Sequence, residues 1–428
     1  MKSYKELSHD ELLELQGALN KEYADAKSKG LSLNMARGKP SPEQLGFSMG
    51  IMDVLNSSSE LVSEDGTDCR NYGVLDGIPE AKRLMAGMVG TKSENMIVCG
   101  NASLPIMYDT VARSYAFGVC GGKPWCKQEH VKFLCPVPGY DRHFAITEQF
   151  GIEMINIPMH EDGPDMDLVE KYVESDSSVK GIWCVPKYSN PEGVCYSDEV
   201  VRRFAALKPA AEDFRIYWDN AYAMHHLYPD QPVEILDIIE ECEKAGHPDM
   251  VFEFCSTSKV TFSGSGVAAV ATSEKNREWF KKTMTIQTIG YDKINQLRHV
   301  KYFGDIEGMK AHMVKMADSL RPKFEAVHEV LEAELGGLEI GKWTDPKGGY
   351  FISFYTLPGC AKKVAAMCKD AGVTLTGAGA TYPYKKDPED SNIRIAPSFP
   401  TVDEMKLAAK LFALCVKLVS VEKLLEEK

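Results

Sequence analysis

The sequence predicts an α/β protein: a mostly parallel, seven-stranded sheet sandwiched by helices, with a smaller α+β domain built from both ends of the chain. Seven short apolar runs between about residues 95 and 272 are predicted strands: MIVCG, VKFLC, EMINI, GIWCV, RIYWD, MVFEFC and VAAVA. Most are separated by segments of helical character, at 104–117, 165–174, 197–207 and 233–244. This alternation implies crossover connections, and therefore a mostly parallel sheet.

The two ends of the chain differ from this central region. Ser8 and Glu11 have the spacing of a capping box, and leucines follow with roughly helical periodicity, which predicts a first helix. The C-terminal end contains the strand-like run GGYFISFYTL and a final helix rich in lysine and leucine. A chain of 428 residues is too long for one ordinary core. We therefore predict a large domain at 51–330 and a small domain formed by 1–50 and 331–428, joined by long helices at 274–334.

The composition argues against several classes of partner. A count of 49 Lys and Arg against 62 Asp and Glu gives a net charge of -13, the wrong sign for binding phosphate backbones, so no nucleic acid is expected. The N-terminus lacks the apolar core of a signal peptide, and no uncharged run approaches the ~20 residues of a membrane span, so we expect no membrane partner and a cytoplasmic location. None of the 12 cysteines forms a Cys-x-x-Cys pair, which favours buried thiols over a metal site.

Ligands of open parallel sheets bind at the carboxyl ends of the strands, so polar residues that follow the apolar runs are candidates for a site. The run GIWCV is followed by PKYSNPEG, in which Asn190 and Pro191 signal a turn that by itself indicates only a loop. The run RIYWD ends in Asp219, an acid that must find a partner if it is buried. A helix N-cap is an equally good interpretation of Asp219 taken alone.

The run MVFEFC leads into FCSTSKVTFSGSG, where Lys259 stands among hydroxyl residues and glycines. A lysine at a strand end is usually a solvated surface charge. The surrounding serines and glycines, however, supply hydroxyls, amides and close backbone approach, which suit a phosphate. A lysine held near other groups can also lose its proton and attack a carbonyl. Together with the upstream acid, these residues indicate a site for pyridoxal 5'-phosphate.

The ordered motifs resemble those of a known superfamily. The set resembles the aminotransferase class I/II superfamily, the fold-type I pyridoxal phosphate enzymes, in Asn190-Pro191-Glu192-Gly193, Asp219-x-Ala221-Tyr222, Ser256-x-x-Lys259 and Arg394. The stretches MARGKPSPEQL, RNYGVLDGIPEAK, PGYDRHFAI and IRIAPSFP are similar to the divergent aspartate aminotransferase subgroup, also called MocR-like aminotransferases. The resemblance spans most of the chain, and it implies the fold-type I large domain with its small domain.

The resemblance implies roles around the cofactor ring. Lys259 would hold pyridoxal 5'-phosphate as an internal aldimine and act as general acid and base. Asp219 would pair with the pyridinium nitrogen, and Tyr222 and Asn190 would hydrogen-bond the phenolic oxygen. Tyr140 occupies the ring-stacking position of the superfamily; a lone aromatic residue there would otherwise be core.

Other implied contacts concern the cofactor phosphate. Tyr72 matches a tyrosine that reaches the phosphate from the neighbouring subunit, which implies a homodimer. Most relatives carry an arginine eight residues after the lysine, where this chain has Val267. The cation that replaces this arginine is left open by the sequence. The remaining phosphate contacts would come from a helix N-terminus and a hydroxyl, at Asn101, Ala102, Ser103 and Ser256.

The substrate side would be formed by Arg394, Gly38 and Asn190. In the superfamily this arginine binds the substrate α-carboxylate through a bidentate pair, and the glycine lines the entrance. A side-chain carboxylate would need a second cation. The sequence leaves three candidates for it, namely Arg37, Lys293 and Arg298.

The resulting functional hypothesis is an aminotransferase that moves the amino group of aspartate to a 2-oxo acid such as 2-oxoglutarate. Alanine, aromatic or broad donor specificity stays open. A carbon–sulfur lyase or a decarboxylase on the same fold is a second hypothesis, because its cofactor residues would look alike. A cofactor-sensing regulator is a third, and it would be expected to carry a basic helix-turn-helix domain. A nicotinamide enzyme is disfavoured because no Gly-x-Gly-x-x-Gly follows the first strand.

Overall fold

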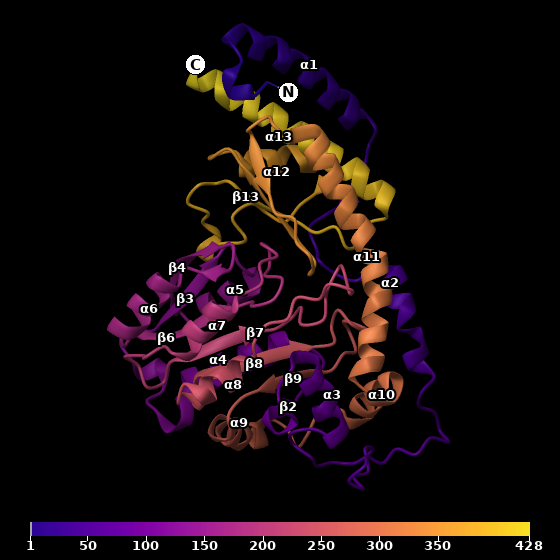
Figure 1. The fold of residues 1–428 in the computed structure, drawn as a ribbon, viewed down its shortest axis with the longest axis vertical. Helices are drawn as coiled ribbons and strands as arrows, with labels where there is room; N and C mark the ends of the chain where they lie inside the picture. The colour runs from indigo at the N-terminus through magenta and orange to yellow at the C-terminus, as the bar shows by residue number, and fades with distance from the viewer. Residues whose placement is uncertain (1) are drawn as a thin grey trace.

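Eight strands form the large sheet of the computed structural model, which describes residues 2–428 (Figure 1). Their order across the sheet is β2 (Met96–Val98), β9 (Ala268–Ala271), β8 (Val251–Ser256), β7 (Arg215–Asp219), β6 (Val179–Cys184), β3 (Lys132–Val137), β4 (Glu153–His160) and β5 (Gly163–Pro164). The five central strands from β8 to β4 pair in parallel, whereas β9, β2 and β5 pair antiparallel. The predicted mostly parallel sheet is therefore confirmed, and all seven predicted strands are present. The eighth, β5, consists of two residues and has no apolar run that would signal it.

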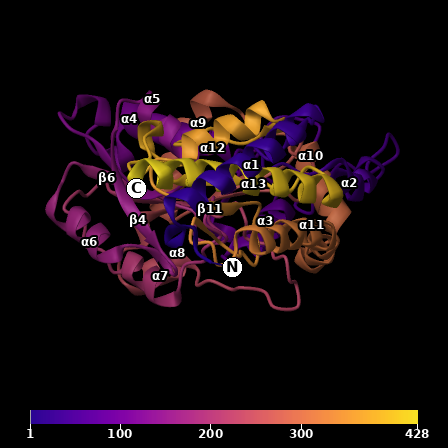
Figure 2. The ribbon, with the colours of Figure 1, turned by 90° about the horizontal axis from the view of Figure 1, so that it is seen from above.

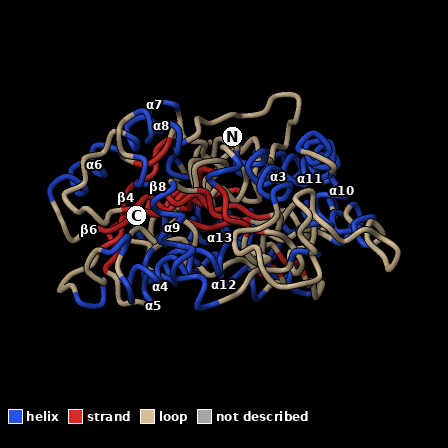
Figure 3. The backbone as a smooth tube through the Cα atoms, turned by 90° about the horizontal axis from the view of Figure 1, so that it is seen from below, coloured by secondary structure: helices blue, strands red, loops and turns tan. Residues whose placement is uncertain are grey.

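Helices cover both faces of this sheet, as the apolar character of its strands requires. The pleat of β7 directs Ile216 and Trp218 into one core and Tyr217 into another. The first core includes side chains of α3 (Pro79–Val89), α6 (Met166–Ser175), α7 (Asp198–Ala205), α8 (Ile238–Lys244), α10 (Lys293–Phe303) and α11 (Ile306–Leu335). The second includes α4 (Ser103–Phe117), α5 (Asp141–Gln149) and α9 (Glu274–Gln287). Figure 3 shows the strands as the middle layer between the helices.

A third core joins the two ends of the chain. It includes residues of α1 (His9–Ser28), α12 (Ala361–Asp370) and α13 (Val402–Glu427), which lie at one end of the molecule in Figure 1 and over the rest of it in Figure 2. Beside them lies an antiparallel sheet of β10 (Gly341–Trp343), β11 (Ile352–Thr356) and β13 (Asn392–Ile395). A short parallel pair, β1 (Leu33–Asn34) and β12 (Val373–Thr374), ties the N-terminal segment to the C-terminal one. The capping box of α1, with Ser8 and Glu11, is confirmed.

The long helix α11 contributes to two of these cores. Its first half packs into the core of the large sheet through Met309 and Met313, and its second half packs into the third core through Phe324 and Val327. A predicted connection by long helices is therefore confirmed. The exact division at residues 50 and 330 stays a prediction. No helix within residues 2–428 combines the length and the hydrophobicity that a bilayer crossing demands.

One predicted helix was wrong at its start. The segment 233–244 is helical only from Ile238, because the Asp237 side chain caps the helix by accepting a hydrogen bond from the Ile239 amide. The residues before this cap form an irregular loop that follows β7.

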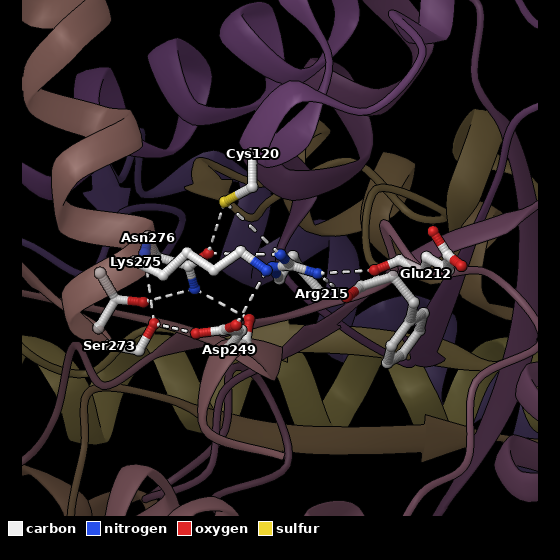
Figure 4. A network of polar contacts seen from close by, with 9 residues as sticks. Cys120, Glu212, Arg215, Asp249, Ser273, Lys275 and Asn276 are labelled. Carbon is white, nitrogen blue, oxygen red and sulfur yellow. Dashed lines mark hydrogen bonds and ion pairs between the residues drawn. The ribbon is translucent and has the colours of Figure 1, made fainter.

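A polar network closes the opposite, amino-terminal edge of the sheet (Figure 4). The buried Arg215 guanidinium donates to the Phe214 carbonyl at 2.8 Å and to Asn276 Oδ1 at 3.3 Å. Asn276 in turn donates to the Asp249 carbonyl at 2.9 Å, and Cys120 Sγ lies 3.2 Å from Asn276 Oδ1. This network ties β7 to the start of α9 and lies at the end of the sheet away from the predicted site.

Candidate active site

A cavity of about 470 Å³ lies at the carboxyl ends of β6 and β7, between the large sheet and residues of the third core. Strand ends, the first turn of α4 and the small antiparallel sheet all contribute to its walls. The structure brings together eight of the predicted site residues as its lining: Gly38, Ser103, Tyr140, Asn190, Asp219, Tyr222, Lys259 and Arg394.

Asp219 is a buried acid with one free oxygen. It is the last residue of β7 and is 2% exposed. His143 Nε2 donates a hydrogen bond to Asp219 Oδ2 at 2.8 Å, whereas Oδ1 has no partner among residues 2–428. The His143 ring stacks on Trp183, with centroids 4.4 Å apart and planes at 8°, which fixes its orientation. The carboxylate is thus held from one side and available from the other.

Lys259 presents a lysine amine that no hydrogen bond engages within the described part of the chain. Its Nζ lies 5.1 Å from the centroid of the Tyr222 ring and 6.0 Å from that of Tyr350. Burial lowers the pKa of Lys259; the Asp219 carboxylate raises it in part, and the Arg394 guanidinium lowers it again. A lowered pKa favours the neutral amine, which is the form that attacks a carbonyl and accepts a proton.

Arg394 extends from β13 into the cavity and is 8% exposed. Its Nη1 donates to Asp141 Oδ1 at 3.0 Å and to Asn190 Oδ1 at 3.2 Å, and its Nη2 donates to Thr376 Oγ1 at 3.3 Å. The guanidinium lies 4.7 Å from the centroid of the Phe351 ring. The Nε atom has no partner within residues 2–428. Asp141 therefore occupies the position at which an incoming carboxylate would compete for this arginine.

The cavity wall is so closely packed at Gly38 that a side chain there would clash. A Cβ atom built there would lie 2.5 Å from Cζ of the Phe351 ring, well inside van der Waals contact. Because Phe351 is buried and also stacks under Arg394, it has little room to move. A glycine at this position keeps the space above Phe351 open.

The loop 263–266 after Lys259 packs against the start of α4. Asn101 Nδ2 donates to the Gly264 carbonyl at 3.5 Å, and a Cβ at Gly266 would lie 2.9 Å from the Asn101 carbonyl oxygen. Arg298 from α10 donates to Ser265 Oγ at 2.7 Å. Val267, which has no charge to offer, is buried at 3% exposure. The guanidinium of Arg298 is therefore the cation that this chain holds at the loop.

Comparison with known proteins gives the family of the chain. The family model described as aspartate amino-transferase matches residues 7–428. The chain belongs to the aspartate aminotransferase family. A putative aminotransferase of Mycolicibacterium smegmatis is 46% identical over 428 residues, which cover 100% of both chains. The aspartate aminotransferase of Corynebacterium glutamicum is 47% identical over 405 residues, covering 94% of this chain and 93% of the relative.

A solved structure agrees with this assignment. An aspartate transaminase from Corynebacterium glutamicum superimposes with a TM-score of 0.96 at 45% identity, covering 99% of each chain. The chain is therefore an aminotransferase, and the predicted superfamily and fold class are confirmed.

Several predicted residues of this aminotransferase lie outside the cavity lining. Asn101, Ala102 and Ser256 lie behind the lining at the loop 263–266 and the end of β8, where Ser256 Oγ donates to Ser258 Oγ at 3.0 Å. Tyr72 is 81% exposed and does not line the cavity of its own chain. Of the three candidate cations, Arg37 lines the cavity, whereas Lys293 and Arg298 do not.

Lys293 is engaged elsewhere in the aminotransferase. It is buried, and its Nζ donates to the Gly73 carbonyl at 2.9 Å, which leaves it no access to the cavity.

Other residues of the candidate site were not predicted from the sequence. His143 stands three residues after Tyr140 in PGYDRHF, one helical turn into α5, and this spacing could have identified it. Asp141 and Arg142 of the same stretch also line the cavity, as do Phe351 and Thr376. No local signal marks these last two, because only the tertiary fold brings the segments before β11 and after β12 to the cavity.

Proposed function

We propose that this aminotransferase uses pyridoxal 5'-phosphate to move the amino group of aspartate to a 2-oxo acid such as 2-oxoglutarate. The observation that carries the proposal is the convergence of three groups on one cavity: the free oxygen of Asp219, the unengaged amine of Lys259 and the guanidinium of Arg394. An acid, an amine and a carboxylate-binding cation are the groups that this reaction needs from the protein.

The residues present fit the proposed cofactor. Asp219 Oδ1 is a buried acceptor that has no partner in the described part of the chain, which suits a protonated ring nitrogen. Ser103 begins α4 and lines the cavity, so the helix N-terminus can receive a phosphate together with the loop 263–266. Arg298 at Ser265 would balance the phosphate charge in place of an arginine at Val267. Tyr140 and Tyr222 would hold the ring from its face and its edge.

The mechanism follows from what these side chains do. Pyridoxal 5'-phosphate, when bound, supplies an electron-withdrawing ring that stabilises negative charge at the substrate α carbon. Arg394 binds the substrate α-carboxylate through two parallel hydrogen bonds, taking over the position of Asp141. Lys259 Nζ, with its lowered pKa, would accept the proton from the α carbon of the amino donor and, in the reverse direction, give a proton to the α carbon of the 2-oxo acid that receives the amino group. Asp219, oriented by His143, keeps a negative charge at the buried end of the cavity.

The proposed aspartate specificity rests on two supports. The relative from Corynebacterium glutamicum, 47% identical, is an aspartate aminotransferase. The cavity is also lined by two further cations, Arg37 and Arg142, either of which could receive a side-chain carboxylate. Assignment to the MocR-like subgroup stays a prediction.

The homodimer is a proposal supported by the exposed surface around Tyr72. Tyr72, at 81% exposure, is joined on this surface by Ile286 and Ile289, at 90% and 61%. The segments that carry them touch, because Gly290 packs against the Gly73 carbonyl. Exposed apolar side chains of this size are typical of subunit interfaces.

A cytoplasmic location is a separate proposal. It is supported by the 12 cysteines, which are all free thiols.

A panel of amino donors tests the function. Purified enzyme with 2-oxoglutarate is offered aspartate, alanine, phenylalanine and cysteine, and glutamate formation is measured. We expect aspartate to give the highest kcat/KM. Release of ammonia and pyruvate without an acceptor would identify a lyase instead, and release of carbon dioxide a decarboxylase.

Matched variants test the side-chain cation. Arg37→Leu and Arg142→Leu are compared with wild type on aspartate and on alanine. One of them should raise the KM for aspartate at least about tenfold while leaving the KM for alanine unchanged, because only aspartate carries the second carboxylate. Equal effects on both donors in both variants would exclude these cations as the specificity determinant.

A further inference from the structure

A second cavity, of about 670 Å³, lies behind the catalytic one. The segment 219–224 separates them. Asp219, Ala221 and Tyr222 line the catalytic cavity, whereas Asn220, Ala223 and Met224 line the second. No residue lines both. The other walls of the second cavity come from the end of α3, the first turns of α11 and the loop that precedes α8.

The second cavity has the size and the lining of a small-molecule site. Ligand pockets usually measure about 300–1,000 Å³ and combine an apolar lining with a few polar groups. Thioether, aliphatic and proline side chains form one part of the wall, and charged or polar side chains form another; the apolar part comprises Met88, Val89, Met224, Pro229, Pro232, Ile235, Met313 and Val314.

A buried ammonium points into this cavity with almost nothing to bind. Lys187 lines the cavity, and its side chain is 5% exposed. Its one ionic partner, Glu234 Oε2, lies 3.8 Å away, which is too long for a hydrogen bond. The Glu234 side chain is 80% exposed and therefore well solvated. No hydrogen bond from Lys187 Nζ exists among the side chains of residues 2–428. Burial lowers the pKa of Lys187, and the Glu234 carboxylate opposes this only in part, so an anion that joined the side chain would stabilise its charged form.

A second donor stands beside this ammonium. Tyr188 OH and His226 Nδ1 are 2.6 Å apart, and this is the one hydrogen bond of the hydroxyl within the described chain. In the tautomer in which the hydroxyl donates to Nδ1, the ring proton is on Nε2 and is available to a ligand. Burial and the nearby Lys187 charge lower the pKa of His226 to about 4, so the ring is neutral at pH 7. The other lysine of the lining, Lys310, is engaged by Glu307 at 2.7 Å.

We propose that this cavity is a second ligand site, which binds a small carboxylate with an apolar tail. The carboxylate pairs with Lys187 and accepts a hydrogen bond from His226, and the exposed Glu234 moves aside into water. The tail packs against the methionines and prolines of the wall. The proposal concerns binding alone and does not depend on which amino acid the catalytic site accepts.

Hexanoate is the probe, and calorimetric titration of the purified enzyme is the measurement. Wild type is compared with Lys187→Met, which keeps the length of the side chain without its charge. A second comparison is Arg394→Met, which removes the cation proposed to bind the α-carboxylate in the catalytic cavity. We expect saturable binding in wild type and in Arg394→Met, weakened at least about tenfold in Lys187→Met, as loss of a charged hydrogen-bonding partner predicts. Hexan-1-ol should bind far more weakly than hexanoate.

Three results would overturn the proposal. They are the absence of saturable hexanoate binding in wild type, binding that survives in Lys187→Met but not in Arg394→Met, and equal binding of hexanol and hexanoate. Ala311→Trp provides a variant that leaves the buried lysine in place. Ala311 is an exposed residue at the mouth of the cavity, so the indole should block the site while the protein stays folded. Undiminished hexanoate binding in Ala311→Trp would also contradict the assignment.

Discussion

Replacing Glu253 by glutamine should remove a specific pH dependence of stability. Glu253 lies in β8 and is 3% exposed; Asn220 Nδ2 donates to its Oε1 at 3.0 Å. Its Oε2 and the Asn220 Oδ1 both lack partners within residues 2–428. Burial, aided by the Asp237 charge, raises the pKa of Glu253 to about 8 against the opposing hydrogen bond from Asn220. Below that pH the carboxyl group is neutral and carries a proton that Asn220 Oδ1 can accept.

The sign and size of the effect follow from linkage. Because the pKa is higher in the folded protein than its usual 4.5, folding is favoured most below pH 4.5 and loses this contribution as the pH rises through 8. At about 1.4 kcal/mol per pKa unit, the free energy of unfolding should fall by about 4 kcal/mol between pH 5 and pH 9 from this group alone. Glutamine has the shape of the neutral acid and offers its amide to Asn220 Oδ1, but it does not titrate.

Urea unfolding at fixed pH values between 5 and 9 measures the difference. All other groups are common to both proteins, so subtracting the two curves isolates Glu253. We expect wild type and Glu253→Gln to be close in stability at pH 5, with the variant increasingly more stable toward pH 9. A difference that is constant across this range, or one that favours wild type at pH 9, would refute a neutral Glu253.

The catalytic cavity gives four further predictions. Lys259→Ala should abolish the visible absorption of bound pyridoxal 5'-phosphate, and an unchanged spectrum would exclude this lysine as the attachment point. Asp219→Ala should reduce kcat about a hundredfold or more, through loss of a preorganised charge, in steady-state assays; near-normal turnover would contradict its role. Arg394→Lys should raise the KM for the amino donor at least about tenfold, because lysine cannot form the bidentate pair, and an unchanged KM would argue against carboxylate binding there. Gly38→Ala should destabilise the protein by about 1–3 kcal/mol in thermal unfolding through its clash with Phe351, so equal melting temperatures would mean that the ring yields.

Much of the fold was predictable because each central strand carries its own signal. A strand that helices cover on both faces appears in the sequence as a continuous apolar run, and all seven such runs are strands in the structure. The two residues of β5 lack such a run. The helix predicted from 233 failed because the Asp237 side chain competes with the helix for backbone amides, and an apolar pattern does not report that competition.

The residues of the candidate site also divide into those that the local sequence indicates and those that it does not. Lys259 and Asp219 follow strands directly, so the edge of a parallel sheet brings them together, and the sequence order sufficed to associate them. Arg394 was predicted from the resemblance to the superfamily. Its separation from Lys259 along the chain does not indicate how close the two side chains are in space. The spacing of one helical turn from Tyr140 is a local signal for His143, whereas the contact between α5 and β7 that brings it to Asp219 comes from the tertiary fold. Lys187 has no local signal, because its burial and the cavity beside it arise only from the tertiary fold.

The segment 219–224 forms a wall between two cavities, with some of its residues lining one and some lining the other. A movement of this segment caused by a ligand in one cavity would therefore change the shape of the other. If a molecule in the rear chamber displaces Met224 or Asn220 and thereby alters substrate affinity by some factor, substrate must alter the affinity of that molecule by the same factor. The concentration of the carboxylate bound in the second cavity would then influence how far the catalytic cavity is saturated with substrate. The same six residues would both position catalytic groups and transmit this influence.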